Sequence, residues 1–174
     1  AIDPAALLWI LPCDQYIKDT NILQNTVLKA AEYEQKDKLF VFGVKPTSPH
    51  TGYGYVEVGS LIKEDLSNVA SFKEKPDEAT AQTYLDRGNY LWNSGMFLFP
   101  TKLILKEIES LNPKIYNAAK RSIEDAQEDL DFLRLPAEPL ENCPNISIDY
   151  AVLEKSENVA VVPLETQWSD LGSW

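Results

Sequence analysis

The stretch that decides the fold is Ala6-Leu7-Leu8-Trp9-Ile10-Leu11, a continuous apolar run that stops at Pro12-Cys13-Asp14. Such a run is typical of a strand that is buried on both faces, as in a parallel sheet. After an N-cap at Asp19 or Thr20, apolar residues recur at helical spacing, and Leu39–Val44 is a second apolar run. The inward positions of this helix are Leu23, Val27, Ala30 and Ala31. The first 45 residues therefore predict one strand–helix–strand unit with a right-handed crossover.

The rest of the chain also alternates between strand and helix signals. Extended stretches are predicted at Gly54–Val58, Val69–Lys75, Tyr90–Phe99 and Val159–Val162, with a turn-rich segment at Ser60–Asn68. Helices are predicted from Pro76-Asp77 to Gly88, from a Thr101 cap to Asn112-Pro113, from Tyr116 to about Asp129, and at Ser147–Val152. Pro136–Pro144 is the best loop candidate. This alternation predicts a layered α/β fold with a mixed sheet.

Composition excludes several classes of protein. Of 174 residues, 44% are hydrophobic and 25% are charged, which is typical of a globular domain. The formal net charge of −11 disfavours nucleic acid and anionic membranes as partners. Two cysteines, Cys13 and Cys143, are too few for a disulfide scaffold, and the single histidine, His50, excludes a zinc site of the His/Cys type. His50 lies in a predicted turn, where a catalytic role is disfavoured.

Organisation along the chain indicates one domain, because there is no repeat, low-complexity tract or linker. The chain begins at Ala1 without an initiator methionine and stops at Trp174, within a pattern of polar and aromatic residues. We therefore expect residues 1–174 to be the middle and C-terminal part of a single domain of a longer protein.

Two carboxylates follow predicted strands. Asp14 ends the first apolar run, and Asp170 follows the last strand, between Trp168 and Trp174. Ligands of open α/β sheets collect at the carboxyl ends of strands, and carboxylates suit Mg²⁺ that also holds phosphates. A capping role for Asp14 and a plain turn for Asp170 are the alternative interpretations.

Polar residues also interrupt the central strands. In Phe72-Lys73-Glu74-Lys75-Pro76, a lysine suits a phosphate and a carboxylate suits sugar hydroxyls, although an exposed edge strand with alternating charges explains the same pattern. Strand alternation places Lys73 and Lys75 on one face and Glu74 on the other. In Trp92-Asn93-Ser94-Gly95-Met96, the interruption predicts a bulge or a close approach of a ligand. Gly54, in Thr51-Gly52-Tyr53-Gly54-Tyr55, allows close approach to the backbone.

Taken together, these segments resemble the bacterial mannose-1-phosphate guanylyltransferases. The matching pieces, in the order of the family, are Leu11–Asp14, Thr51–Tyr55, Phe72–Pro76, Trp92–Phe99, Ser147–Val152 and Trp168–Trp174. The resemblance implies an α/β, Rossmann-like nucleotide-diphospho-sugar transferase fold with a mixed sheet flanked by helices, truncated at its N-terminus. It implies a cytoplasmic enzyme that uses Mg²⁺, GTP and mannose 1-phosphate to make GDP-mannose and pyrophosphate.

The same resemblance assigns the site residues. Asp14 and Asp170 match the metal carboxylates, and Gly54, Glu74, Lys75 and Asn93 match positions that hold the sugar phosphate. Asp14, Lys75 and Asp170 are the catalytic candidates. The sequence departs from the family at Pro12-Cys13-Asp14-Gln15, where the family usually has histidine in place of Gln15. The glycine-rich Gly-x-Gly-x-Arg-Leu-x-Pro loop of the family is absent from residues 1–174.

Two other functions are compatible with the sequence. Without the glycine-rich loop, the chain is also compatible with a non-catalytic sugar-phosphate-binding or regulatory module. Glu-Lys-Pro is shared with uridylyl- and thymidylyltransferases that act on glucose 1-phosphate, although Trp92–Phe99 and Ser147–Val152 count against them.

In the family, the strand ending at Asp14 lies against an upstream strand, so we expect an exposed apolar edge around Leu7–Leu11 here, and with it a homodimer.

Overall fold

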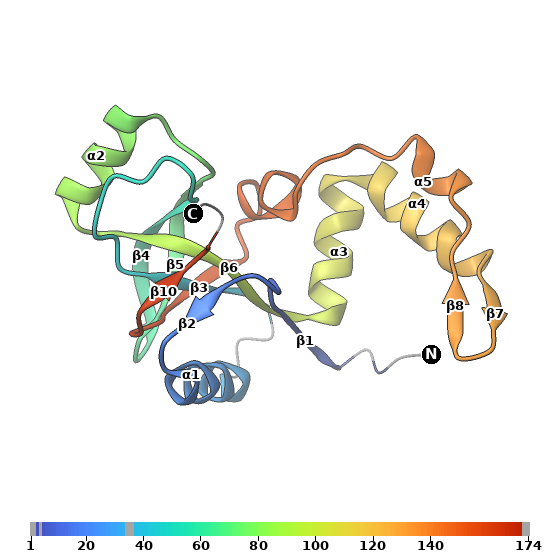
Figure 1. The fold of residues 1–174 in the computed structure, drawn as a ribbon, viewed down its shortest axis with the longest axis horizontal. Helices are drawn as coiled ribbons and strands as arrows, with labels where there is room; N and C mark the ends of the chain where they lie inside the picture. Colours follow the sequence, from blue (N-terminus) through green and yellow to red (C-terminus); the bar gives the residue numbers. More distant parts are fainter. Residues whose placement is uncertain (1–2, 4, 34–36, 172–174) are drawn as a thin grey trace.

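A computed structural model describes residues 3, 5–33 and 37–171 (Figure 1). The strands are β1 (Leu7–Ile10), β2 (Tyr16–Ile17), β3 (Leu39–Val44), β4 (Tyr55–Lys63), β5 (Leu66–Lys73), β6 (Tyr90–Pro100), β7 (Gln127–Asp129), β8 (Phe132–Arg134), β9 (Val159–Pro163) and β10 (Trp168–Ser169). The helices are α1 (Thr20–Glu32), α2 (Glu78–Arg87), α3 (Thr101–Leu111), α4 (Pro113–Glu124) and α5 (Glu138–Glu141), with a π-helical turn, η1, at Asp149–Leu153. The C-terminal part of the Trp168–Trp174 motif, residues 172–174, lies outside the described residues.

The main sheet is mixed, as predicted, and it closes on itself. Its strand order is β1-β6-β3-β9-β5-β4, and β4 also pairs with β6, so five strands form a closed ring with β1 on its outside. Only β3 and β9 run parallel among these described pairings. β6 touches β1, β3 and β4 along its eleven residues, and it is therefore the strand that joins the ring to the outer edge.

The first apolar run forms a strand, but the prediction that this strand is buried on both faces is wrong. β1 pairs with β6 alone among the described strands, and its four residues are 37–42% exposed. Together with Leu11, they form the apolar edge that the family resemblance implied. β1 and β3 are both antiparallel to β6, so the strand–helix–strand unit is present with β6 inserted between its strands.

The helices begin and end where local chemistry favours it. Asp19 caps α1 by accepting hydrogen bonds from two backbone N–H groups, and Asp77 caps α2 in the same way at Thr80. Gly88 ends α2 at a left-handed φ of 71°. The predicted Thr101 cap is wrong, because Thr101 is already helical and its hydroxyl donates to the Ala6 carbonyl at 2.8 Å.

Several predicted boundaries are corrected by the structure. Ser60–Asn68 is mostly strand, because β4 and β5 form a long hairpin that turns at Glu64 and Asp65. The predicted helix from Tyr116 to Asp129 ends at Glu124, since β7 pairs with β8 in a second hairpin. The predicted loop at Pro136–Pro144 contains the short helix α5. Ala31, predicted to face inward, is exposed, and Tyr33 is buried instead.

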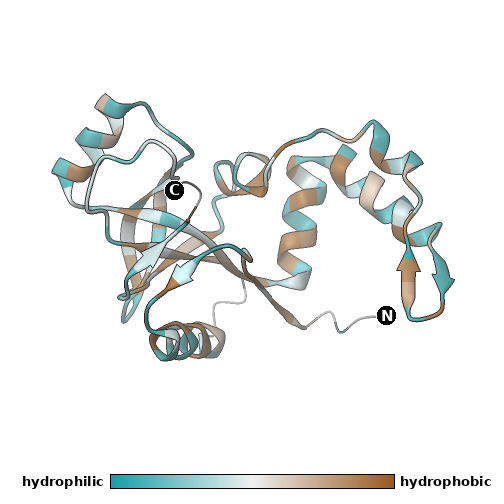
Figure 2. Cartoon of the chain, in the orientation of Figure 1, coloured by the Kyte–Doolittle hydropathy of each residue, from teal (hydrophilic) through white to brown (hydrophobic). Residues whose placement is uncertain are grey.

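Helices cover the sheet from more than one side, as expected for a sheet flanked by helices. One apolar cluster joins Leu23, Val27 and Ala30 of α1 and Ala81 of α2 to the sheet, and a second joins Ile104 of α3 and the η1 turn to it. The α3, α4, α5 and β7–β8 segments extend to one side, where β8 carries an apolar stretch (Figure 2). Among the described residues, no helix has the length and apolar character needed to cross a bilayer.

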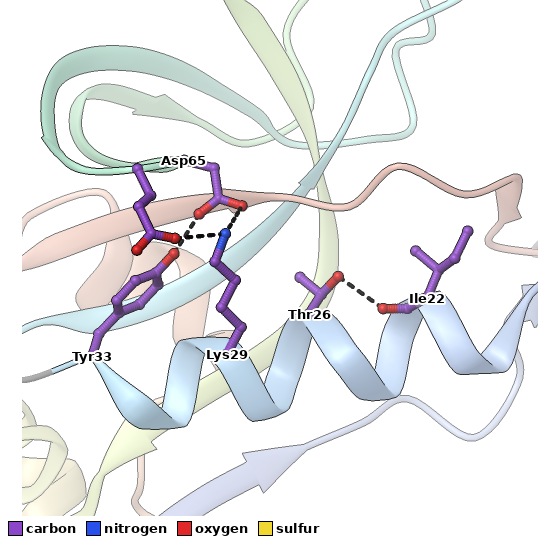
Figure 3. A network of polar contacts seen from close by, with 6 residues as sticks. Ile22, Thr26, Lys29, Tyr33 and Asp65 are labelled. Carbon is purple, nitrogen blue, oxygen red and sulfur yellow. Dashed lines mark hydrogen bonds and ion pairs between the residues drawn. The ribbon is translucent and has the colours of Figure 1, made fainter.

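A polar network fastens α1 to the β4–β5 turn (Figure 3). The Tyr33 hydroxyl donates to one carboxylate oxygen of Asp65, and Lys29 Nζ lies 3.2 Å from the other and 2.9 Å from Glu64. Burial and the hydrogen bond to Asp65 raise the pKa of Tyr33 to about 12. This network orients the helix that follows the Asp14 segment.

Candidate functional site

A pocket of about 250 Å³ gathers most of the predicted site residues. Gly54, Glu74, Lys75, Asn93 and Asp170 all line it, although they come from four separate segments of the chain. Asp14 is exposed and lies outside this lining, while Pro12 and Gln15 on either side of it contribute. A larger open hollow of about 950 Å³ shares Trp168 with this pocket, but none of the predicted site residues lines it.

A bulge in β6 forms the floor of the pocket, as the interrupted sequence predicted. Val41 of β3 pairs with Phe97, and Gly43 pairs with Asn93, so Ser94, Gly95 and Met96 face a single residue of β3. Gly95 has a φ of 73°, a left-handed conformation that glycine adopts without strain. Asn93 Oδ1 accepts from the Gly95 N–H at 3.2 Å, which stabilises the bulge.

Glu74 is enclosed at the end of β5. Its side chain is 11% exposed, and its Oε2 is buried without a hydrogen-bond partner among the described residues. A Cβ added at Gly54 would collide with this oxygen, so glycine at position 54 makes room for the carboxylate. The Glu74 N–H donates to Glu154 Oε1 at 2.8 Å. The buried environment excludes the interpretation of Glu74 as an ordinary exposed edge-strand charge.

Lys75 enters the same pocket because the backbone turns. The predicted alternation of faces is wrong here, since β5 ends at Lys73 and Lys75 has a φ of 46°. Lys75 Nζ lies 3.9 Å from Glu74 Oε1, and the Lys75 side chain is 61% exposed. The pocket therefore pairs a buried carboxylate with a cation that reaches solvent.

Sequence reasoning missed Asp149, the acid that accompanies Glu74 in the pocket. Asp149 begins η1, and its Oδ1 accepts from Asn93 Nδ2 at 2.9 Å. The amide of Asn93 is thus engaged with Asp149 and Gly95. An acid within the otherwise apolar Ile148–Val152 stretch was the available signal.

Crowded carboxylates change the acidity of the site. Burial, the charge of Asp149 and the charge of Glu154 raise the pKa of Glu74 to about 7, while Lys75 acts in the opposite direction. Burial also raises the pKa of Asp149, against the lowering effect of its hydrogen bonds, including the one from Asn93. Near neutral pH the Glu74 carboxyl group is therefore partly protonated.

A short ladder brings the Asp14 and Asp170 segments together. β2 and β10 pair antiparallel, with Trp168 opposite Ile17 and Ser169 opposite Tyr16. Continued by one residue, this register places Asp170 opposite Gln15, and Asp14 is the next residue along. Tyr53 lines the pocket beside them, and burial together with the charge of Asp170 raises its pKa.

The carboxylates near this ladder are oxygen donors of the kind that Mg²⁺ prefers. Asp14 and Asp170 both lie just beyond the same end of the ladder, although only Asp170 lines the pocket, and Mg²⁺ sites commonly take one or two carboxylates, with phosphate and water oxygens completing the coordination. No cluster of three or more metal-binding side chains occurs within the described parts of the chain, so protein ligands alone do not form a closed metal cage there.

Comparisons with known proteins place the chain in a family. The family model for nucleotidyl transferases matches residues 2–174. Mannose-1-phosphate guanylyltransferase RfbM of Salmonella typhimurium is 45% identical over 168 residues, which are 97% of this chain and 35% of the relative. The chain thus spans about a third of the length of this curated relative.

Two solved structures share the fold. A mannose-1-phosphate geranyltransferase from Thermus thermophilus superposes with a TM-score of 0.83 at 31% identity, over 97% of this chain and 47% of the other. A mannose-6-phosphate isomerase from Helicobacter pylori superposes with a TM-score of 0.86 at 31% identity, over 97% of this chain and 65% of the other. From the family match over nearly its whole length, we conclude that the chain belongs to the nucleotidyl transferase family.

Proposed function

We propose that the protein containing this chain transfers GMP from GTP to mannose 1-phosphate, giving GDP-mannose and pyrophosphate. The observation that carries the proposal is the pocket in which a buried, unpartnered carboxylate oxygen of Glu74 lies beside Lys75 and Asp149. Carboxylates accept hydrogen bonds from vicinal sugar hydroxyls, and an adjacent ammonium group binds a phosphate. The name of RfbM supports nucleotide and sugar-phosphate substrates.

The chemistry requires alignment and charge neutralisation. A phosphate oxygen of mannose 1-phosphate attacks the α-phosphorus of GTP, a new P–O bond forms, and the bond to the leaving pyrophosphate breaks. Lys75 offsets the repulsion between the two anions, while Glu74 and Asp149 orient the sugar ring. Nucleotidyltransferases of this family generally use a divalent metal, and Asp14 and Asp170 would hold Mg²⁺, which supplies further neutralisation of phosphate charge.

Pyrophosphate release by the full-length protein tests the proposal. The substrates are mannose 1-phosphate and glucose 1-phosphate, each with GTP, UTP or dTTP, with Mg²⁺ and with a chelator. Preference for mannose 1-phosphate with GTP supports the proposal, and preference for glucose 1-phosphate with UTP or dTTP replaces it. A chelator should abolish turnover if the Mg²⁺ assignment is right.

A second candidate function is a non-catalytic sugar-phosphate-binding module, because the same pocket residues, Glu74, Lys75 and Asn93, suit the binding of a sugar phosphate without any transfer. Titration calorimetry with mannose 1-phosphate decides between the two. Binding without pyrophosphate release by the full-length protein would support the module and contradict the enzyme.

A further inference from the structure

The β2–β10 ladder that carries Asp170 is too short to hold its own position. It contains two residue pairs, and β10 pairs with β2 alone among the described strands. Isolated two-stranded ladders are marginally stable even when longer. A hydrogen bond from the Lys18 N–H to the Gln167 carbonyl at 3.0 Å and the packing of the Trp168 ring against Tyr53, with centroids 5.1 Å apart, support this segment, and a direct connection to β6, the floor of the pocket, would fix Asp170 there.

The side chain of Gln15 makes that connection. Its Nε2 donates to the Ser94 carbonyl at 2.5 Å, on the β6 bulge, and its Oε1 accepts from the Trp168 indole N–H at 3.0 Å, on β10. Both ends of one amide are used, and each contacts a different segment. A Cβ at Gly95 would lie 3.5 Å from Gln15 Nε2, so the amide packs directly over the bulge.

Fixing Trp168 also fixes the carboxylate. Residues two apart on a strand face the same side, and Trp168 and Asp170 both line the pocket, whereas Ser169 between them does not. We infer that Gln15 is a positioning residue, which holds the Trp168–Asp170 segment against the Ser94 carbonyl and thereby sets where Asp170 lies relative to Glu74 and Lys75. This inference rests on the proposed function, because its kinetic consequence concerns phosphoryl transfer at that pocket.

Gln15→Met in the full-length protein removes both hydrogen bonds at similar volume. Because misplacement of a reacting group by about 1 Å can cost on the order of 100-fold, kcat should fall about 10- to 100-fold. The KM for mannose 1-phosphate should change by less than about threefold, since the contacts of Glu74 and Lys75 do not involve Gln15. Gln82→Met is the matched control, because Gln82 bonds to Asp86 on the exposed face of α2, away from the pocket.

A second variant and a spectroscopic readout separate this role from general destabilisation. Gln15→Glu keeps the acceptor for Trp168 and loses the donor to Ser94, so kcat should fall as in Gln15→Met. In ¹⁵N-tryptophan-labelled protein, the indole N–H of Trp168, assigned by its loss in Trp168→Phe, should exchange with solvent at least several-fold faster in Gln15→Met and remain protected in Gln15→Glu.

The outcomes distinguish the inference from the proposed function. An active parent with parental kcat in Gln15→Met, or with an effect on KM alone, overturns the positioning role. If the parent releases no pyrophosphate with any substrate pair, the proposed function fails. The exchange rate of the Trp168 indole N–H then tests the Gln15 connection by itself. Faster exchange in Gln15→Met supports the connection, and unchanged exchange overturns it. If Gln15→Met does not fold, kcat of Gln15→Glu decides for an active parent.

Discussion

Burial and carboxylate neighbours give Glu74 a proton affinity that an exposed glutamate does not have. Its pKa of about 7 lies well above the ordinary value of 4.5. The native state therefore binds this proton more tightly than the unfolded chain does, and stability contributed by the bound proton is lost as pH rises from about 4.5 through about 7.

Glu74→Gln should remove this dependence. We compare the free energy of unfolding of the variant with that of the parent, as variant minus parent. This difference should be smallest near pH 4.5 and increase towards pH 8. Because one pKa unit corresponds to about 1.4 kcal/mol, the increase should reach up to about 3 kcal/mol. Urea unfolding across this pH range measures the difference. The exposed Glu141→Gln is the control, and a difference that is flat with pH would refute the burial argument.

Lys75 should matter for the sugar phosphate, and its neighbour Lys73 should not. Loss of a charge-assisted hydrogen bond costs about 1.5–3 kcal/mol, so Lys75→Ala should weaken binding of mannose 1-phosphate on the order of 10- to 150-fold. Lys73→Ala removes an exposed charge at the end of β5 and should leave binding nearly unchanged. Calorimetry on the full-length variants compares them, and equal affinities would remove Lys75 from the site.

Among the elements, those with strong apolar runs were predictable and the shortest were not. Leu39–Val44 was predicted with the observed bounds, because buried strands produce continuous apolar sequence. β2 and β10 have two residues each, too few for a periodic pattern, and their pairing is a tertiary contact between distant segments. Motifs that match a family pointed to residues that the structure gathers in one pocket, as at Glu74, whose role stays a prediction. The connection through Gln15 depends on side-chain geometry that one-dimensional sequence does not contain.

The network between α1 and the β4–β5 turn should contribute to stability. Burial alone would raise the pKa of Asp65, but the hydrogen bonds from Tyr33 and Lys29 lower it. The contribution of Asp65 to stability is therefore present above the ordinary aspartate pKa and is lost as pH falls. Tyr33→Phe should cost about 1.5–3 kcal/mol at pH 7, the range for a hydrogen bond to a charged group, and less near pH 3.

Urea unfolding at both pH values measures this loss. Tyr116→Phe, which removes the hydroxyl of a half-buried tyrosine on α4 outside the network, provides the control. An equal loss at both pH values would show that the charge of Asp65 is not involved.

At the scale of the whole molecule, the exposed apolar edge of β1 favours self-association. β1 presents four apolar side chains and one unpaired side of its backbone to solvent among the described contacts, and such edges associate. Residues 1–174 expressed alone should therefore form dimers or larger species, and sedimentation velocity at increasing concentration should detect them. Leu8→Lys should shift the distribution towards monomer, whereas Leu28→Lys, an exposed leucine on α1, should not. A sharp monomer at high concentration would contradict this expectation.

The closed ring of strands has a consequence for how the molecule opens. Because β6 bonds to three strands and the ring joins Tyr55 to Trp92 and Ser67 to Val161, no strand of the ring can leave without breaking two ladders. Amide hydrogens of β3 and of β6 should therefore exchange with deuterium only through global unfolding. The two strands of the β7–β8 hairpin contact mainly each other, and α5 contacts mainly α4, so the amides of the hairpin and of α5 should exchange through separate local openings of lower free energy. The floor of the pocket would then belong to the slowest-exchanging unit of the protein, and the Gln15 hydrogen bonds would tie the short β10 strand, which precedes Asp170, to that unit.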